Sequence, residues 1–197
     1  NHGQMDVSIV GTGYVGATVA ACFADLGHQV TTIDIDEDVV AAINAGEAPI
    51  EEPGLDDLVE QYGGTRLQAT TEYASVVETA VTFLALPTPS NDDGSIDLAH
   101  MEAATDSLGA ALAAKSTDHT VVVKSTVIPG TTADQITPIL ESASGLEAGE
   151  TLHVGMNPEF QREGSAVDDF LAPDKLVFGS EGERALEAMR AVYEPLL

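Results

Sequence analysis

The residues best suited to catalysis lie together, directly after one short apolar run. The run covers residues 152–156 (LHVGM), and residues 157–166 (NPEFQREGSA) follow it. This segment places two carboxylates, Glu159 and Glu163, beside an amide and a guanidinium. A short apolar run predicts a strand, and in open α/β sheets ligands bind where the strands end. Carboxylates in such a place suit the roles of general base and electrostatic stabiliser.

A solvated surface is the competing interpretation of both glutamates, because the chain holds 33 acidic residues. Their position at a predicted strand end and the Asn-Pro-Glu-Phe frame around Glu159 favour the functional interpretation. Glu159 and Glu163 are four positions apart. A helical turn over this segment would therefore place both carboxylates on one side.

A glycine-rich loop near the amino terminus indicates a second kind of site. It lies between a predicted strand, residues 7–10, and a predicted helix, residues 14–26. In a dinucleotide-binding loop the first glycine permits a tight turn, the second lets the pyrophosphate approach the backbone, and the third lets helix and strand pack closely. N–H groups of the first helical turn hold the phosphates. The predicted cofactor-binding residues of this loop are Gly11, Gly13, Tyr14, Val15 and Gly16.

Asp34 gives this site its expected preference for NAD. It ends a predicted strand over residues 29–34, about 20 positions after Gly11, where dinucleotide-binding domains place a ribose-binding acid. Its carboxylate would accept hydrogen bonds from the ribose hydroxyls and repel a 2′-phosphate, and no arginine lies nearby in the sequence. We therefore expect NAD rather than NADP. The competing interpretation is a strand–helix turn that binds nothing, followed by a chance acid.

Two further segments place hydroxyl groups at predicted strand ends. Thr88 stands between two prolines after residues 80–86, and Ser125 and Thr126 follow residues 120–124. A threonine held between prolines could bond a cofactor, but a simple strand terminator explains it equally well. Taken alone, Ser125 and Thr126 are better explained as turn formers.

The order of elements predicts an α/β fold of the Rossmann type, a doubly wound and mostly parallel sheet with helices on both faces. Short β-rich runs alternate with helical stretches along the whole chain. Strands are expected at residues 7–10, 29–34, 66–69, 80–86, 120–124, 152–156 and 175–178. Helices are expected at residues 14–26, 37–44, 55–61 and 182–193, and a capping-box pattern at 132–135 predicts the start of another.

Composition restricts the class of protein. The 197 residues include 33 acidic and 7 basic ones, for a net charge of −26, and such a surface repels nucleic acid and anionic lipid. No apolar run approaches the roughly 20 residues of a membrane helix, so we expect a cytoplasmic protein with no membrane partner. Because salt screens self-repulsion, the composition also predicts a halophile's protein. Cys22, the only cysteine, is expected to be buried, and neither a disulfide nor a metal site is expected.

The chain resembles the UDP-glucose/GDP-mannose dehydrogenase family over essentially its whole length from Met5. The matching segments are residues 10–16, 48–55, 93–98, 157–166 and 169–174. The resemblance implies an NAD-binding Rossmann-like domain over residues 5–197, and residues 1–4 are expected to be a cloning remnant. The chain departs from the family pattern at Glu51, where the family usually has tyrosine, and at Pro87, where glycine is usual.

The resemblance also implies roles for residues that spacing alone leaves open. Thr126 and Glu159 become the expected catalytic residues: Thr126 would help to hold the hydrolytic water, and Glu159 would act on that water or on the oxidised intermediate. Thr88 and Thr126 are expected to contact the dinucleotide, and Glu163 is expected to contact both cofactor and substrate. The implied substrate-binding residues are Glu159, Phe160, Gln161, Arg162 and Glu163.

The family oxidises a sugar alcohol to an acid in two hydride transfers, through a thioester on a cysteine beyond a long central helix. Leu197 precedes any such segment, so we expect this chain to be the amino-terminal domain of a longer, homodimeric enzyme. The domain is expected to be inactive alone. UDP-glucose is the expected substrate, with GDP-mannose as the alternative. A different class is a module that binds NAD without chemistry. A 3-hydroxyacid or phosphogluconate-type dehydrogenase shares the glycine loop but does not explain residues 157–160.

Overall fold

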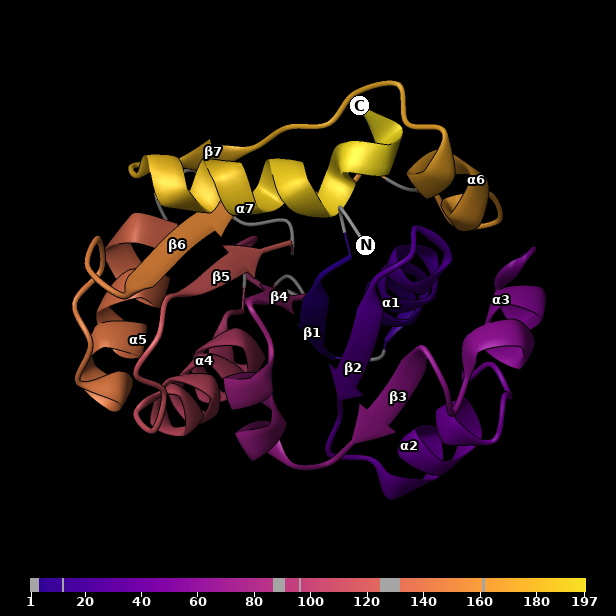
Figure 1. Cartoon of the computed structure of the whole chain (residues 1–197), viewed down its shortest axis with the longest axis horizontal. Coiled ribbons are helices and arrows are strands. Elements are labelled where there is room, and N and C mark those ends of the chain that lie inside the picture. The colour runs from indigo at the N-terminus through magenta and orange to yellow at the C-terminus, as the bar shows by residue number, and fades with distance from the viewer. Residues whose placement is uncertain (1–3, 12, 87–90, 96, 125–131, 161) are drawn as a thin grey trace.

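The computed structural model describes residues 4–11, 13–86, 91–95, 97–124, 132–160 and 162–197. Within these residues, seven strands form one sheet in the order β3-β2-β1-β4-β5-β6-β7. Neighbouring strands run parallel except β6 and β7, which are antiparallel. The direction of strand addition reverses between β1 and β4, which is the switch point where doubly wound sheets bind ligands. The predicted Rossmann-type fold is confirmed (Figure 1).

Strands and helices alternate along the chain much as the sequence predicts. The strands are β1 Asp6–Val10, β2 Gln29–Ile33, β3 Leu67–Thr70, β4 Val81–Leu84, β5 His119–Val123, β6 Leu152–Met156 and β7 Gly179–Ser180. The helices are α1 Tyr14–Asp25, α2 Glu37–Asn44, α3 Leu55–Tyr62, α4 Ala99–Leu112, α5 Thr137–Ser144, α6 Ala166–Leu171 and α7 Glu183–Tyr193. Short 3₁₀ helices cover Tyr73–Glu78 and Glu194–Leu196, and a π-helical turn covers Thr132–Ile136. Among the described helices, none has both the length and the apolar character needed to cross a membrane.

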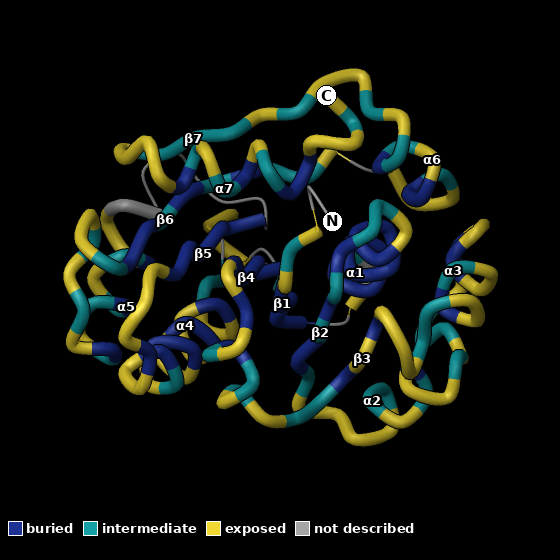
Figure 2. The backbone as a smooth tube through the Cα atoms, viewed as in Figure 1, coloured by how far each residue is buried: buried dark blue, intermediate teal, exposed yellow. Residues whose placement is uncertain are grey.

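Helices cover both faces of the sheet because its central strands carry apolar residues on both sides. Val122 belongs to one apolar cluster, and its neighbours Val121 and Val123 belong to the other. On the first face α1, α6 and α7 meet around Phe23, whose ring lies 5.4 Å from that of Tyr193. On the second face α4 and α5 pack against each other and the sheet. Figure 2 shows β4 and β5 buried between these layers, and β1 is buried there from Val7 to Val10.

The strand predicted at residues 175–178 is wrong. The structure has only the two-residue β7, which pairs antiparallel with Gly155 and Met156. The apolar residues before β7 are used for packing instead, and the Phe178 ring lies 5.4 Å from that of Tyr193. The carbonyl of Val177 accepts a hydrogen bond from the Asn157 side chain at 2.9 Å. The Asn157 side chain therefore supplies a backbone hydrogen bond that a neighbouring strand would otherwise supply.

The longest helix, α4, was not among the predicted elements. Its buried positions, among them Met101, Thr105, Leu108 and Leu112, recur every three or four residues, as an amphipathic helix requires. The α4 sequence is rich in alanine and follows a loop rather than a strand, so no strand-to-helix turn marks where the helix begins. Its apolar stripe was nevertheless readable from the sequence.

A chain of polar groups crosses the buried sheet near the amino ends of its strands, away from the predicted site. Lys115 Nζ lies 2.9 Å from His119 Nδ1, and His119 Nε2 lies 2.7 Å from Thr82 Oγ1. The Thr82 hydroxyl lies 2.7 Å from that of Ser8, which lies 3.1 Å from Thr79 Oγ1. His119 Nδ1 also lies 3.1 Å from Thr79 O, which accepts a hydrogen bond from Lys115 Nζ as well. Burial, and then the positive charge of Lys115, lower the pKa of His119 to about 3.

We expect the protein to lose stability as the pH falls from 6.5 towards 3 because of His119. The unfolded histidine takes up a proton below its ordinary pKa of 6.5, whereas the folded one stays neutral down to about 3. Between pH 6.5 and pH 5 this difference removes about 2 kcal/mol of unfolding free energy. Urea unfolding in molar KCl should show the loss as a decreasing advantage of the wild type over His119→Gln. An advantage that stays constant over this range would contradict the prediction.

Candidate functional site

The carboxyl ends of the strands bring the predicted site segments to one edge of the sheet. Hydrogen bonds between the residues that follow each strand and the neighbouring strand fix their order. The N–H of Gly11 bonds Ile33 O at 2.9 Å, and that of Ala85 bonds Val10 O at 3.0 Å. The N–H groups of Lys124 and Asn157 likewise bond the last residues of β4 and β5, each at 2.9 Å. The glycine loop and the Asn-Pro-Glu-Phe segment therefore share one edge, with the ends of β4 and β5 between them.

The structure explains each of the three loop glycines differently. Gly11 has φ +100°, and a Cβ there would lie 2.7 Å from Ala85 O. A Cβ on Gly16 would lie 2.0 Å from Gly11 O, so helix and strand touch as the motif predicts. A Cβ on Gly13 would meet nothing within 4 Å. Gly11 and Gly16 are thus required by the fold, whereas the open space over Gly13 fits a ligand that approaches the backbone.

The amino end of α1 fits an anionic group. Gly13 is the N-cap of this 12-residue helix, and no side chain caps it by a hydrogen bond. The first N–H groups of a helix have no partner within the helix, and together they carry a partial positive charge. A pyrophosphate over Gly13 would satisfy them, so the described residues of the loop fit a dinucleotide. Thr12 and the side chain of Tyr14 lie outside the described residues.

Asp34 lies where a ribose-binding acid is expected, at the end of β2. Its N–H donates to Thr70 O at 3.1 Å, and its Oδ1 accepts a hydrogen bond from Asp36 N at 2.7 Å. Asp36 in turn caps α2 through Asp38 N, 2.9 Å from its carboxylate. The turn between strand and helix therefore fixes the Asp34 carboxylate at the edge that holds the glycine loop.

Glu159 is held by a buried ammonium that the sequence prediction did not single out. Lys124 Nζ lies 3.0 Å from Glu159 Oε2 and donates to Asn157 Oδ1 at 2.9 Å. Lys124 is only 2 % exposed. Asn157 also accepts a hydrogen bond from the Tyr193 hydroxyl. Burial lowers the pKa of Lys124, and the negative charge of Glu159 opposes that change.

Aromatic rings close the other side of this ammonium. Lys124 Nζ lies 5.7 Å from the centre of the Phe170 ring and 5.6 Å from that of Tyr193. At such distances the faces of aromatic rings attract a cation. The two rings belong to α6 and α7, so both helices contribute to the environment of the Glu159 carboxylate.

The described residues between Glu159 and Glu163 do not form the helical turn that would align the two carboxylates. Glu159 and Phe160 have no helical structure, and Glu163 lies in a turn with Gly164, whose φ is +91°. The left-handed glycine reverses the chain before α6 begins. Glu163 is exposed, whereas the side chain of Glu159 is 11 % exposed. The two carboxylates therefore have separate environments and need separate roles.

The other predicted substrate contacts lie on the exposed part of the same segment. Phe160 is 49 % exposed, and its ring lies 4.6 Å from Lys175 Nζ. The Arg162 guanidinium forms a two-point ion pair with Asp169, with N–O distances of 2.9 and 3.2 Å. Gln161 lies outside the described residues. So do Thr88 and Thr126, and their predicted roles stay predictions.

Glu52 anchors this segment from a distant part of the chain. Its carboxylate is 5 % exposed and accepts hydrogen bonds from Gly164 N at 3.1 Å and from Ala166 N at 2.8 Å. It thereby satisfies the amino end of α6 and fixes the turn that carries Glu163. The sequence of residues 48–55 does not by itself indicate this role, because nothing local shows which N–H groups Glu52 would meet.

We expect Glu52→Ala to destabilise the protein by about 2–3 kcal/mol, because the buried N–H of Ala166 and the partly buried N–H of Gly164 lose a charged acceptor. Glu52→Gln keeps one acceptor oxygen and should cost less. Urea unfolding of the two variants in molar KCl measures both effects. Equal stability of Glu52→Ala and the wild type would show that the clamp is dispensable.

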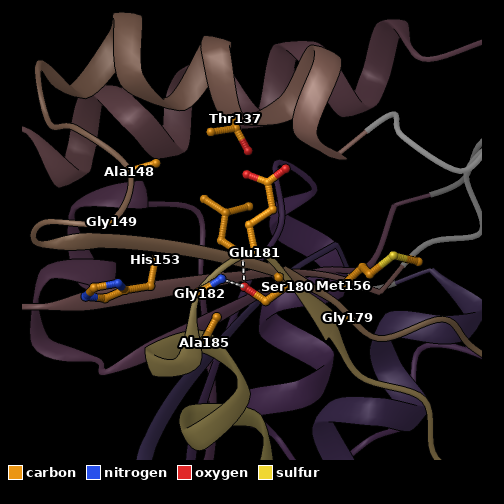
Figure 3. Close-up of a pocket in the computed structure, with 12 residues that line it drawn as sticks. Thr137, Ala148, Gly149, His153, Met156, Gly179, Ser180, Glu181, Gly182 and Ala185 are labelled. Atoms are coloured by element: carbon orange, nitrogen blue, oxygen red, sulfur yellow. Dashed lines mark hydrogen bonds between the residues drawn. The ribbon is translucent and has the colours of Figure 1, made fainter.

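Two pockets of similar size are candidates for the place where a substrate binds. The first, of about 480 Å³, is lined by Lys124, Glu159, Phe160, Arg162, Lys175 and Tyr193 among others. The second, of about 450 Å³, lies at the outer edge of the sheet between β6, β7, α5 and the start of α7. Figure 3 shows Glu181 pointing towards Thr137 across it. Of the predicted site residues, Glu159, Phe160 and Arg162 line the first pocket and none lines the second, so we place the substrate end of the site at the first pocket.

Comparison with known proteins decides the family. The family described as "UDP-glucose/GDP-mannose dehydrogenase family, NAD binding domain" matches residues 5–197. The chain belongs to this family. Since the matching part is the family's NAD-binding domain, the cofactor predicted from the glycine loop and Asp34 is confirmed.

Relatives within the UDP-glucose/GDP-mannose dehydrogenase family act on two kinds of nucleotide sugar. A UDP-glucose 6-dehydrogenase of Haloferax volcanii is 58 % identical over 193 residues, which cover 98 % of this chain and 45 % of that enzyme. A GDP-mannose 6-dehydrogenase of Pseudomonas aeruginosa is 40 % identical, with 98 % of this chain and 44 % of that enzyme covered. The chain thus spans less than half the length of these curated relatives.

Solved structures of family members have the same fold. A GDP-mannose dehydrogenase from Pseudomonas aeruginosa, in a ternary complex, superposes with a TM-score of 0.93 at 40 % identity, covering 96 % of this chain and 44 % of that one. A UDP-glucose dehydrogenase from Pyrobaculum islandicum gives a TM-score of 0.92 at 39 % identity, covering 98 % and 45 %.

Proposed function

We propose that this chain is the cofactor-binding part of an NAD-dependent nucleotide-sugar 6-dehydrogenase, which oxidises UDP-glucose to UDP-glucuronate. The observation that carries the proposal is the buried pair of Glu159 and Lys124 on the same sheet edge as the glycine loop. A domain that only bound NAD would have no need of a buried, ion-paired carboxylate there. The 58 % identity to a UDP-glucose 6-dehydrogenase supports this sugar over GDP-mannose.

The described residues divide the work of binding. Gly13 and the amino end of α1 would hold the pyrophosphate, and Asp34 would hold the adjacent ribose. Bound NAD supplies the acceptor for the hydride. Arg162 and Lys175 place positive charge around the pocket that contains Glu159. The pocket is also lined by Asp168, Asp169 and Asp174, so its basic side chains do not by themselves select an anionic substrate.

Glu159 supplies the group that can accept a proton. A carboxylate at a strand end can take a proton from a hydroxyl or from a water molecule. Its low exposure shields it from bulk solvent, and Lys124 stabilises its negative charge. The predicted partner in catalysis is Thr126. We further propose that the whole enzyme is a cytoplasmic homodimer that serves polysaccharide synthesis in a halophile, the last point being supported by the Haloferax relative and the acidic composition.

The proposal is tested by counting NADH. The protein is expressed at its full natural length and assayed in molar KCl with limiting UDP-glucose and excess NAD. Two NADH per sugar are expected, because oxidation of an alcohol to an acid removes two hydrides. One NADH would mean that the reaction stops at the aldehyde. Turnover with GDP-mannose alone would reassign the sugar, and no turnover with either would favour the module that binds NAD without chemistry.

A further inference from the structure

The ammonium of Lys124 lies in a site built from four separate parts of the chain. The lysine directly follows β5, Asn157 and Glu159 follow β6, and the Phe170 and Tyr193 rings come from α6 and α7. Such convergence requires the complete fold. It is also unusual in this protein, because the surface carries almost all of the other charges.

Stability alone is a poor reason for this buried pair. A buried ammonium and a buried carboxylate both lose hydration, and their attraction often fails to offset that loss. Apolar residues of similar volume would fill the same space between the Phe170 and Tyr193 rings at no such cost. The pair therefore calls for an explanation in terms of what it does to Glu159.

The contacts fix the Glu159 carboxylate at both oxygens. The N–H of Phe160 donates to Oε1 at 2.9 Å, and Lys124 Nζ lies 3.0 Å from Oε2. A carboxylate held in this way keeps a single orientation. The ammonium also favours its charged form, which is the form able to accept a proton.

We propose that Lys124 is a positioning residue, which orients Glu159 and keeps it ionised for proton transfer. The inference deepens the proposed function and rests on it for the role of Glu159. The Lys124 ammonium contacts Glu159 and Asn157, and the residue is 2 % exposed, so it acts through the glutamate rather than on the substrate.

Other ionisable groups around Glu159 have different arrangements. Arg162 is paired with Asp169, and Lys175 lies over the Phe160 ring. The phenol of Tyr193 faces the pair from α7, and burial raises its pKa, so it stays neutral. From α1 the buried thiol of Cys22 faces the same region, and burial raises its pKa as well. The remaining acids lining the pocket are Asp168, Asp169 and Asp174.

The test is a double-mutant cycle in the full-length enzyme, with the variants Lys124→Met, Glu159→Gln and the two combined. Methionine keeps the length of the lysine stem without its charge. We expect Lys124→Met to lower kcat for UDP-glucose about a hundredfold, with little change in the KM for NAD. In the Glu159→Gln background the same change should cost almost nothing, since the group that Lys124 positions is already gone. Equal losses in both backgrounds would overturn the proposal.

The pH profile gives a readout that a purely structural role would not move. In Lys124→Met the acid limb of kcat/KM should shift to higher pH, because the neutral carboxylic acid is no longer disfavoured by the ammonium. A profile of unchanged shape and position would overturn the proposal. Urea unfolding of each variant in molar KCl shows that the comparison is made on folded protein.

A second measurement separates this proposal from the proposed function. If the wild type oxidises neither sugar, the proposed function fails, and the 197-residue chain is used instead. The carboxyl ¹³C signal of Glu159, assigned by its loss in Glu159→Gln, is followed against pH in the wild type and Lys124→Met. Its titration should move to higher pH in the variant. Identical titration in the two proteins would overturn the role of Lys124 irrespective of the reaction.

Discussion

Gly13→Ala is expected to weaken NAD binding while leaving the fold intact, whereas Gly16→Ala is expected to destabilise the fold. A Cβ on Gly13 meets no atom within 4 Å, and the residue's φ of −66° is open to any amino acid. The methyl group would instead project into the space that a pyrophosphate must enter to reach the N–H groups of α1. We expect the Kd for NAD to rise at least about tenfold and the unfolding free energy to change by less than about 1 kcal/mol.

Gly16→Ala is expected to lose stability, because the added Cβ would lie 2.0 Å from the backbone oxygen of Gly11. No rotamer relieves an overlap between a Cβ and a main-chain atom, so helix α1 must move away from β1. We expect a loss of about 3 kcal/mol or more in unfolding free energy. Calorimetric titration with NAD and urea unfolding, both in molar KCl, separate the two variants. Normal NAD affinity in Gly13→Ala, or wild-type stability in Gly16→Ala, would contradict this division of roles.

The cofactor half of the site was predictable because its signals are local. The glycines, the strand before them and the helix after them lie within 20 residues, and Asp34 follows in the next strand. The glycines, the strand, the helix and the acid all indicate the same kind of site, and this agreement lets a short motif be recognised from a single sequence. The structure adds one distinction, since Gly13 is the only one of the three loop glycines that faces open space.

The substrate half was predictable only in part because its contacts join distant segments. Glu159 could be located at a strand end, but its partner Lys124 comes from another strand, and its position beside Glu159 depends on the order of β5 and β6. Glu52 is farther still, 112 positions from Gly164, whose N–H it binds. The supposed helical turn between Glu159 and Glu163 fails for the same reason, because a distant carboxylate shapes that turn.

Apolar runs misled the prediction where the fold uses them without a sheet partner. Leu176, Val177 and Phe178 have the composition of a strand, yet Asn157 binds the backbone there and Phe178 packs on Tyr193. In the opposite case, α4 was missed because its apolar stripe is diluted by alanine and glycine. The first error concerns a distant packing partner, and the second concerns a weak local pattern.

The charge of the described surface leads to the second large effect. Within the described residues, only four acids form ion pairs with lysine or arginine: Asp118, Glu159, Asp169 and Glu183. The helices α2 and α3 begin with acidic pairs, Glu37–Asp38 and Asp56–Asp57, and neither has a basic residue in its last turn. Most of the 33 acids therefore repel one another without compensation.

We expect the protein to be much more stable in molar KCl than in dilute buffer. The Debye length falls from about 10 Å at 0.1 M salt to about 3 Å at 1 M. The repulsion that favours the expanded chain is then screened. The midpoint of thermal unfolding should rise by about 10 °C or more, which corresponds to a few kcal/mol for a chain of this size.

Screening can be told apart from a general solvent effect by two controls. Sucrose at the same osmolality stabilises by exclusion from the surface but screens no charge, so it should raise the midpoint far less than KCl. The variant Asp106→Asn removes an exposed acid from the middle of α4, one helical turn after the exposed Glu102. It should raise the midpoint at low salt and leave it nearly unchanged at high salt. A midpoint that is the same in dilute and molar KCl would mean that the acidic surface is tolerated without salt, and composition alone would then be no guide to a halophilic origin.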